Sequence, residues 1–291
     1  MNKQLNTLLK NLNIIPNSFQ EFKPDRVYLV KTSEISLIVK FTPLLWAVDE
    51  VFFFQNLEAH SIPHPKLLYF GKVTNEVGYV ITEYMPNAVD TLNDNLRADP
   101  NFWRKLAFEL QKINSIPVTG FGFNRSDTFG VQNFTSTSFL QFISTVLLEL
   151  SDKLNNSPYS ELVTKLKNKQ KNLKERKQAY LTHGDFGGNN FLWYPDARDI
   201  YFFDAGYLRG MPKTWDIAYF GWRIHPQRVT AEDVKTFSAC YFEHLLDDYT
   251  KFEISFFKGL IGLMKVSDGF VSNSVDEKHV AAARQNISEI T

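Results

Sequence analysis

Three oxygen-bearing side chains near the middle of the chain have types and a spacing that could do chemistry. Asp185 follows the apolar run Ala179-Tyr180-Leu181, and Asn190 comes five residues later. Asp204 ends a second apolar run, Phe202-Phe203. A carboxylate can orient a hydroxyl and accept its proton, while a carboxylate and a carboxamide are hard oxygen ligands of the kind that Mg²⁺ prefers. The three residues predict a base, Asp185, and two metal ligands, Asn190 and Asp204, as phosphoryl transfer requires.

The loop between the base and the first metal ligand has its own signature. Gly187 and Gly188 allow a tight turn, and His183 precedes the base, where we expect it to brace the loop by hydrogen bonds. Taken alone, a His-Gly-Asp tripeptide is a weak signal, because glycine next to aspartate is common in ordinary turns. The joint pattern is far more specific.

This pattern resembles the aminoglycoside phosphotransferase and choline kinase family, whose members are relatives of protein kinases. The form His183-Gly184-Asp185-Phe186-Gly187 with Asn189-Asn190, followed by Trp215-Asp216-Ile217-Ala218 and by Trp222-Arg223-Ile224-His225-Pro226, looks most like hygromycin B phosphotransferases. The resemblance runs from about Val27 to about Trp222. It implies a kinase that uses ATP or GTP with Mg²⁺ to phosphorylate a hydroxyl of a small molecule.

The resemblance also implies roles for residues outside the catalytic hairpin. Lys40 matches the strand lysine that contacts the α- and β-phosphates. Glu50 matches the acidic helix residue that pairs with this lysine, with Asp49 as a rival. In the hinge, the Glu83 carbonyl and the Met85 amide would meet the adenine edge. Asp216 would support the catalytic loop.

Two departures from the family pattern stand out. Ala205 follows the metal aspartate where an aromatic residue is usual, and the turn Lys31–Glu34 between the first two predicted strands contains no glycine. Phosphate binding by the backbone amides of this turn is therefore unsupported by the sequence. Because neither departure removes a catalytic group, a catalytically dead nucleotide-binding regulator is the least favoured alternative.

The segments before the hairpin predict a compact unit of strand, strand, helix, strand, strand. The strands are rich in β-branched and aromatic residues, and the helix has apolar residues at helical spacing. These segments are Arg26–Val30, Ser36–Phe41, a helix from Leu44 that ends before Ile62-Pro63, Lys66–Phe70 and Gly78–Glu83.

After this unit the pattern becomes mainly helical. The predicted helices are Asn101–Ile116, Ser138–Leu154, Ser160–Lys177, Trp215–Trp222 and most of the chain beyond Thr230; Thr119–Gly130 is expected to be a loop, and Phe191–Trp193 and Ile200–Phe203 a strand pair. The fold class that follows is α+β, a bilobal protein-kinase-like fold. Residues 1–86 form a nucleotide-binding lobe with a small antiparallel sheet, and residues 87–291 a larger, mainly helical lobe with the catalytic loop and acceptor site.

Composition excludes several other classes of protein. The 291 residues include 32 basic and 32 acidic side chains, so no net charge attracts nucleic acid. In the basic stretch Lys165–Lys177, leucines recur at helical spacing, which favours a solvated helix face. No apolar stretch is long enough to span a membrane, and the polar segment Met1–Gln20 is not a signal peptide. We therefore expect a cytoplasmic protein, a monomer or weak dimer, with neither nucleic acid nor membrane as partner.

The acceptor stays open between two classes of small molecule. An aminoglycoside or aminocyclitol antibiotic, hygromycin-like, is the first hypothesis, and an amino alcohol or sugar of metabolism is the second. Polycationic acceptors favour an acidic pocket, whereas this chain is neutral overall. Asp247 and Asp248 are nevertheless candidate acceptor contacts, because they cluster with Glu232, Asp233 and Glu243 where the resemblance places the acceptor site. The alternative for these acids is a solvated helix face.

Overall fold

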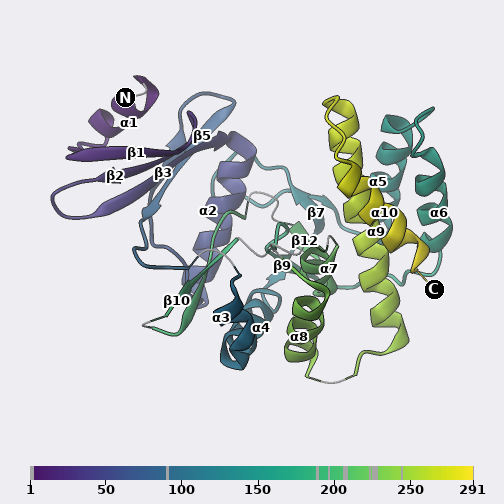
Figure 1. The fold of residues 1–291 in the computed structure, drawn as a ribbon. Coiled ribbons are helices and arrows are strands. Elements are labelled where there is room, and N and C mark those ends of the chain that lie inside the picture. The colour runs from purple at the N-terminus through teal and green to yellow at the C-terminus, as the bar shows by residue number, and fades with distance from the viewer. Residues whose placement is uncertain are drawn as a thin grey trace.

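The computed structural model describes residues 3–89, 92–187, 190–195, 197–205, 209–222, 224, 229–243 and 245–290. Its chain forms two lobes that lie side by side (Figure 1). The first lobe is built around an antiparallel sheet, and the second is mainly helical. The predicted α+β, protein-kinase-like fold is confirmed. Within the described ranges, no helix combines the length and apolarity needed to cross a membrane.

The sheet of the first lobe has five antiparallel strands in the order β1-β2-β3-β5-β4. Its strands are β1 (Ser18–Lys23), β2 (Val27–Lys31), β3 (Ser36–Pro43), β4 (Leu67–Lys72) and β5 (Val77–Glu83). Buried and partly buried residues alternate along β3, because successive side chains point to opposite faces of a sheet. Lys40 pairs with Val27 on one side and with Val80 on the other, so it lies in the middle of the sheet.

The part of the first lobe before Arg26 contains elements that the sequence pattern did not indicate. A helix, α1 (Lys3–Asn11), buries Leu5, Leu8 and Leu9 against one face of the sheet. Strand β1 was not predicted, because every one of its residues is exposed and it therefore lacks the apolar alternation that marks a strand. Its pairing with β2 at the edge of the sheet holds it in place.

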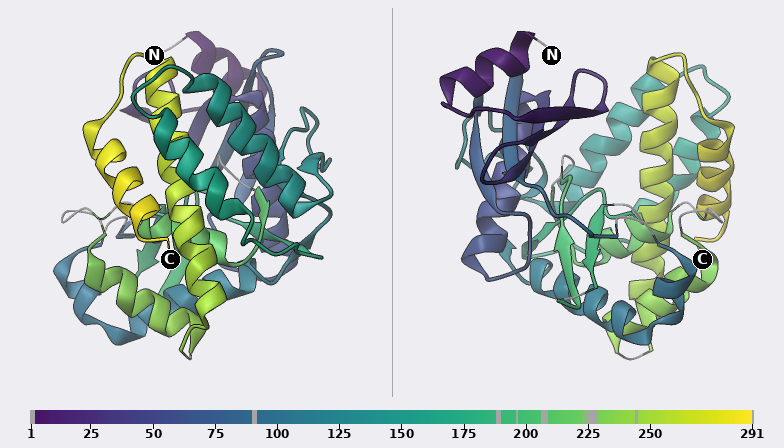
Figure 2. Two further views of the ribbon diagram at one scale, coloured as in Figure 1. Left: turned by 90° about the vertical axis from the view of Figure 1, so that its right-hand side faces the viewer. Right: turned by 60° about the vertical axis from the view of Figure 1, so that its left-hand side comes forward.

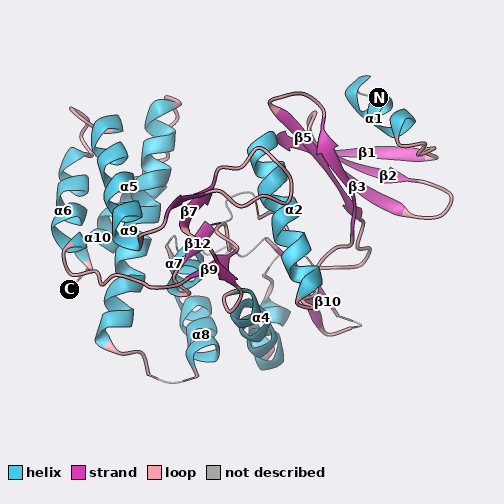
Figure 3. Ribbon diagram, turned by 180° about the vertical axis from the view of Figure 1, so that it is seen from behind, coloured by secondary structure: helices cyan, strands magenta, loops and turns pink. Residues whose placement is uncertain are grey.

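One helix of the first lobe, α2 (Leu44–Ala59), faces both lobes. It lies between the sheet and the strands of the second lobe (Figure 3). Val51, Phe53, Phe54 and Leu57 are fully buried in a hydrophobic core that is mostly made by the second lobe. A helix that is apolar on most sides is expected to be largely buried, and a minority of its residues, among them Leu45 and Trp46, are exposed. Therefore α2 is a structural bridge between the lobes.

The second lobe contains the remaining helices, which gather on the side away from the first sheet (Figure 2). They are α3 (Asp94–Ala98), α4 (Pro100–Ile113), α5 (Phe139–Lys153), α6 (Ser160–Gln170), α7 (Thr214–Gly221), α8 (Ala231–Phe242), α9 (Asp248–Val271) and α10 (Glu277–Ser288). Helix α6 ends at Gln170 and not at Lys177 as predicted. Beyond it, Glu175 accepts the first backbone N–H groups of α5, and Arg176 pairs with the buried Glu253 at 2.7 Å. These tertiary contacts stabilise a non-helical path.

The second lobe also has strands that the sequence only partly predicted. A hairpin joins β10 (Phe191–Tyr194) to β11 (Asp199–Phe202), and a separate sheet has the order β6-β9-β12-β7-β8. Its strands are β6 (Pro117–Val118), β7 (Phe121–Asn124), β8 (Phe134–Ser136), β9 (Ala179–Thr182) and β12 (Arg209–Met211). The predicted loop Thr119–Gly130 therefore contains a strand. Gly122 in it has φ +96, and a Cβ there would lie 2.4 Å from the Phe142 ring, so glycine is required.

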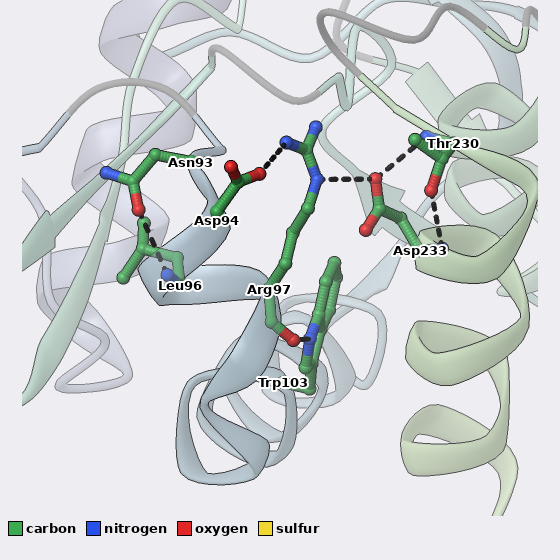
Figure 4. Close-up of polar contacts among 7 residues, drawn as sticks. All are labelled: Asn93, Asp94, Leu96, Arg97, Trp103, Thr230 and Asp233. Carbon is green, nitrogen blue, oxygen red and sulfur yellow. Dashed lines mark hydrogen bonds and ion pairs between the residues drawn. The ribbon is translucent and has the colours of Figure 1, made fainter.

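An ion pair connects the short helix α3 to the start of α8 (Figure 4). Arg97 Nε donates to Asp233 Oδ2 at 3.2 Å, and the exposed Asp94 lies 3.4 Å from the same guanidinium. Asp233 also forms a capping box with Thr230, whose backbone N–H it accepts at 2.8 Å. One buried carboxylate thus stabilises both the helix start and the contact between the two helices.

Candidate active site

The predicted base and the first predicted metal ligand lie in the loop from β9 to β10. Asn190 Nδ2 donates to the backbone carbonyl of Asp185 at 2.6 Å and to its Oδ2 at 3.1 Å. The amide group therefore fixes the carboxylate while its own oxygen remains for another partner. Gly187 accepts the backbone N–H of Asn190 at 3.3 Å. The predicted turn residue Gly188 lies outside the described residues.

A second side chain that forms a hydrogen bond with Asp185 was not predicted. Tyr219 on α7 donates its hydroxyl hydrogen bond to Asp185 Oδ1. It lies three residues after Asp216 and therefore on the same side of the helix. In the sequence, Tyr219 is simply a tyrosine one helical turn after Asp216. Nothing in the sequence indicated that the loop with Asp185 would pack against this turn.

Asp216, which the resemblance implied as a support of the catalytic loop, accepts hydrogen bonds from the start of that loop. Its Oδ2 accepts the backbone N–H of His183 and its Oδ1 that of Gly184, each at 2.9 Å. Gly184 has φ 75, a left-handed conformation that suits glycine. Asp216 is fully buried, and burial raises its pKa in spite of the hydrogen bonds that favour the carboxylate.

Two further residues, which were not predicted from the sequence, hold Asp216 in place through hydrogen bonds. Asn114, just after α4, donates to Asp216 Oδ2 at 2.9 Å and to the Leu181 carbonyl at 3.1 Å. Tyr241 on α8 donates to Asn114 Oδ1 at 2.8 Å. Helices α4, α7 and α8 thus converge on the loop. The sequence could have indicated Asn114, because it is a polar residue that directly follows an amphipathic helix.

His183 braces the loop by a different set of contacts. Its Nε2 donates to the Phe203 carbonyl at 2.9 Å, because a carbonyl oxygen can only accept. The imidazole ring is fully buried and meets the Phe53 ring of α2 edge-on, with centroids 5.4 Å apart. The loop is therefore packed against the helix that bridges the two lobes.

The second predicted metal ligand lies close to the first through the β10–β11 hairpin. Phe191 pairs with Phe202, and the Phe203 N–H reaches the Asn190 carbonyl at 3.5 Å. Asp204 follows directly, with φ 58. This left-handed conformation is uncommon for a residue with a side chain, although aspartate tolerates it better than most. Such a position at the end of a strand re-aims the side chain toward the lobe interface.

Lys40 meets both acids that were expected near it. Its Nζ lies 2.9 Å from Glu50 Oε2 on α2 and also bonds the carboxylate of Asp204. Burial alone would lower the pKa of Lys40, but the two carboxylates outweigh it and raise this pKa above its ordinary value. Burial raises the pKa of Glu50, and the ion pair with Lys40 holds the pKa of Asp204 below its ordinary value against the effect of burial. The rival residue, Asp49, lies instead at a cavity described below.

The residues present fit a Mg²⁺ ion that arrives with a nucleotide. Asn190 offers its amide oxygen and Asp204 a carboxylate, and Mg²⁺ is typically held by one or two such groups together with phosphates and water. Within the described part of the chain there is no cluster of three or more His, Cys, Asp or Glu residues suited to a metal. The site therefore suits a metal that is completed by phosphate oxygens.

The hinge residues follow β5, an inner strand of the first sheet that lies between β3 and β4. Glu83 ends β5, and its N–H donates to the Lys66 carbonyl at 2.9 Å. The next residue, Tyr84, donates to the Ser36 carbonyl at 2.9 Å, and Met85 follows it. Their contacts with a nucleotide stay a prediction. Ala205, the departure after the metal aspartate, is fully buried, so its small side chain fits a packed position.

A cavity of about 290 Å³ lies beside Tyr219. Tyr219 belongs to its wall and also bonds Asp185, whereas Asp185 itself is not part of that wall. The wall is formed by Leu45, Trp46 and Asp49 of α2, Phe123–Arg125 at the end of β7, Val146, Glu149, Leu150 and Lys153 of α5, Trp215 and Tyr219 of α7, and Ile261, Met264, Lys265, Ser267 and Asp268 of α9. Both lobes contribute to it.

Two polar groups in this wall lack hydrogen-bond partners in the described structure. Asn124 Nδ2 and Ser267 Oγ are buried, and neither atom has a partner there. The Asn124 oxygen is occupied, since it accepts the backbone N–H groups of Asn133 at 2.9 Å and of Ser126 at 3.3 Å. A buried donor without a partner is unfavourable, so both groups are suited to bind a polar ligand.

The acids predicted from the C-terminal region lie elsewhere. Asp247 caps α9, accepting the Thr250 N–H at 2.8 Å and its hydroxyl at 2.9 Å. Asp248 is fully exposed and pairs with Lys251 at 3.2 Å. Both residues are at the start of α9, whereas the cavity is lined by the segment Ile261–Asp268 near its other end. The structure does not bring them to this cavity, and their role in acceptor binding stays a prediction.

Comparison with known proteins identifies the family. The model of the phosphotransferase enzyme family, APH, matches residues 23–253. The chain belongs to this family. It is therefore a small-molecule kinase, as the sequence pattern predicted, and the match covers Lys40, the catalytic hairpin and Asp216. No curated protein sequence matches the chain.

Solved structures of similar fold include kinases for different acceptors. A thermostable mutant of aminoglycoside phosphotransferase APH(4)-Ia has TM-score 0.72 and 15% identity, over 98% of this chain and 97% of that one. Choline kinase LicA from Streptococcus pneumoniae has TM-score 0.68 and 15% identity, over 99% and 98%. A putative fructosamine-3-kinase from Haemophilus somnus has TM-score 0.68 and 12% identity, over 98% and 95%. These likenesses show that the kinase shares its fold with each of them.

Proposed function

We propose that this kinase transfers the γ-phosphoryl group of ATP to a hydroxyl of a small polyhydroxylated amine held in the cavity beside Tyr219. The observation that carries the proposal is the position of Tyr219, which is part of the cavity wall and hydrogen-bonds the base Asp185. A hydroxyl in this cavity could therefore reach Asp185. We also propose that the kinase works as a monomer, since one chain supplies the base, the metal ligands and the cavity.

In the proposed reaction, each residue of the site has one role. The acceptor oxygen attacks the γ-phosphorus, the bond from that phosphorus to the β,γ-bridging oxygen breaks, and the acceptor proton passes to Asp185. Lys40 would contact the α- and β-phosphates, with Glu50 holding its ammonium group in place. Asn190 and Asp204 would hold Mg²⁺, which supplies positive charge to the phosphates when bound.

An aminoglycoside or aminocyclitol antibiotic is the first candidate acceptor. Asn124 Nδ2 and Ser267 Oγ are buried donors in need of acceptor oxygens, which ring hydroxyls supply. Three carboxylates line the same cavity and could bind ammonium groups, namely Asp49, Glu149 and Asp268. Fold does not fix the acceptor, so this proposal rests on the lining and not on the likeness to APH(4)-Ia.

A metabolic acceptor is the second candidate, for a specific reason. The cavity wall contains as many basic side chains as carboxylates, namely Arg125, Lys153 and Lys265. A polycationic acceptor would meet repulsion from these three side chains. An amino alcohol, a sugar or an acceptor that carries both signs of charge would not.

One experiment separates the candidates. The kinase is incubated with ATP or GTP, Mg²⁺ and a panel of aminocyclitols, aminoglycosides, amino alcohols and sugars, and ADP or GDP release is followed together with product mass. We expect one class to gain a single phosphoryl group, and Asp185→Asn to lower the rate at least about 10²-fold with unchanged nucleotide affinity. If the variant turns over like the natural chain, Asp185 is not the base. If no hydroxyl compound gains mass, transfer to this class is refuted.

A further inference from the structure

Both carboxylate oxygens of Asp185 accept hydrogen bonds from other side chains of the chain. Asn190 donates to Oδ2 at 3.1 Å, and the phenol of Tyr219 donates to Oδ1. These two donors differ in where they lie. Asn190 belongs to the catalytic loop, whereas Tyr219 is part of the wall of the cavity. Tyr219 is therefore a side chain that connects the wall of the cavity to Asp185.

The position of Tyr219 matters because Asp185 can act as the base in two reactions, transfer to an acceptor hydroxyl and transfer to water. In transfer to water, the water oxygen attacks the γ-phosphorus, the bond to the β,γ-bridging oxygen breaks, ADP leaves, and Asp185 accepts the water proton. Water is smaller than every acceptor and is always present. A base that was open on the cavity side would consume ATP whenever a nucleotide was bound.

We propose that Tyr219 suppresses this hydrolysis by holding Asp185 until an acceptor hydroxyl displaces its phenol. The proposal rests on the proposed function of Asp185 as the base. A single water that displaced the phenol would exchange one hydrogen bond for another. An acceptor brings further contacts to the cavity, for example with Asn124 and Ser267, and this binding free energy can drive the exchange.

The surroundings of Tyr219 hold its ring in place, while its hydroxyl proton can still rotate away from Asp185 and give up the hydrogen bond. The side chain is only 6% exposed, and its ring lies 5.7 Å from the Lys265 ammonium group and 6.5 Å from the Trp222 ring. Its helix is anchored by Asp216, which accepts two backbone N–H groups of the catalytic loop. Replacing tyrosine by phenylalanine keeps the packed ring and removes the donor alone. Tyr219 is thus a positioning residue that acts through Asp185.

The test measures ADP release from ATP and Mg²⁺ without an acceptor. We expect Tyr219→Phe to release ADP at least about tenfold faster than the natural chain, while calorimetry gives the same affinity for a non-hydrolysable ATP analogue. Tyr180→Phe is the matched control, because its ring lies under Lys213 and outside the cavity. This control should leave ADP release unchanged. Thermal unfolding of each variant verifies that the fold is kept.

A double variant and the acceptor reaction complete the test. The added hydrolysis should vanish in the variant that combines Asp185→Asn with Tyr219→Phe; added hydrolysis that persists there, or ADP release by Tyr219→Phe equal to that of the natural chain, overturns the proposal. With an acceptor present, Tyr219→Phe should lower the acceptor KM, since no phenol has to be displaced. If no compound of the panel is phosphorylated but Asp185-dependent hydrolysis still rises, the proposed acceptor fails and the role of Tyr219 stands.

Discussion

The ammonium group of Lys40 in the first lobe bonds the carboxylate of Asp204, which lies 164 residues later in the second lobe. The same ammonium group lies 2.9 Å from Glu50. The cation that is expected to contact phosphates is thus paired with two carboxylates. We therefore expect nucleotide binding to include an exchange in which phosphate oxygens take the place of Asp204 and its carboxylate becomes available to a metal ion.

This exchange predicts opposite effects of Asp204→Asn with and without Mg²⁺. With Mg²⁺, we expect ATP to bind at least about tenfold more weakly, because a charged metal ligand is lost. Without Mg²⁺, ATP should bind as well as to the natural chain or better, since Lys40 no longer has to leave Asp204. Asparagine also tolerates the left-handed backbone at this position. Calorimetry under both conditions provides the measurement, and equal weakening under both would contradict the assignment of Asp204 as a metal ligand.

Single substitutions at Asp247 and Asp248 separate capping from acceptor binding. Asp247→Ala should lower the free energy of unfolding by about 1 kcal/mol, because it removes the cap of α9. Asp248→Ala, at a fully exposed neighbour, should change stability by no more than about 0.5 kcal/mol. Chemical denaturation gives both values. If the two acids bind a polyamine acceptor, each variant should also raise its KM, more at low salt than at high salt; an unchanged KM would assign Asp247 to capping alone.

The ion pair drawn in Figure 4 predicts a loss of stability without a loss of chemistry. Arg97→Met keeps the length of the side chain but leaves the buried Asp233 without the donor from α3. We expect the free energy of unfolding to fall by about 1–3 kcal/mol. Asp94→Ala is the control, since Asp94 is fully exposed and contributes little. Urea denaturation of both variants measures the free energy of unfolding. If Arg97→Met were as stable as the natural chain, the ion pair would contribute nothing to stability.

Lys258 on α9 predicts a pH-dependent change in stability. Burial lowers its pKa below the ordinary 10.5, with Glu289 opposing the shift, and its side chain lies against Gly221. Between this lowered pKa and 10.5, the unfolded chain binds more protons at this site than the native chain. Stability at this site therefore rises with pH. Lys258→Met should raise the midpoint of thermal unfolding at pH 7, and the gain should shrink as the pH approaches 10. A gain that is constant with pH would exclude the charge as its cause.

The sequence predicted that the candidate residues of the hairpin lie near one another, because they are local; their catalytic roles stay predictions. Asp185, Asn190 and Asp204 lie on one loop and one hairpin, so their spacing along the chain sets their spacing in space. Lys40 and Glu50 required the family resemblance, since only the packing of α2 against the sheet decides between Glu50 and Asp49. The predicted helices of the second lobe are present, although α6 ends earlier than predicted. Strand β1, exposed at every residue, carried no pattern to detect.

Residues that act through tertiary packing could not be found in this way. Asn114 and Tyr241 reach the catalytic loop from α4 and α8, and only the folded chain brings them together. Tyr219 lies one turn after Asp216 in an apolar helix, but nothing in the sequence places that turn against Asp185. The cavity is less predictable still, because its wall draws on five separate elements from both lobes.

The placement of α2 has a consequence for how the chain folds. Val51, Phe53 and Leu57 belong to the core of the second lobe, although they are encoded within the first 86 residues. A fragment that begins at residue 87 would therefore expose a large apolar surface, and the missing piece would lose most of the burial that stabilises its helix. We expect the two lobes to melt together in one cooperative transition. A chain cut between the lobes would regain activity only when both pieces are refolded in the same solution.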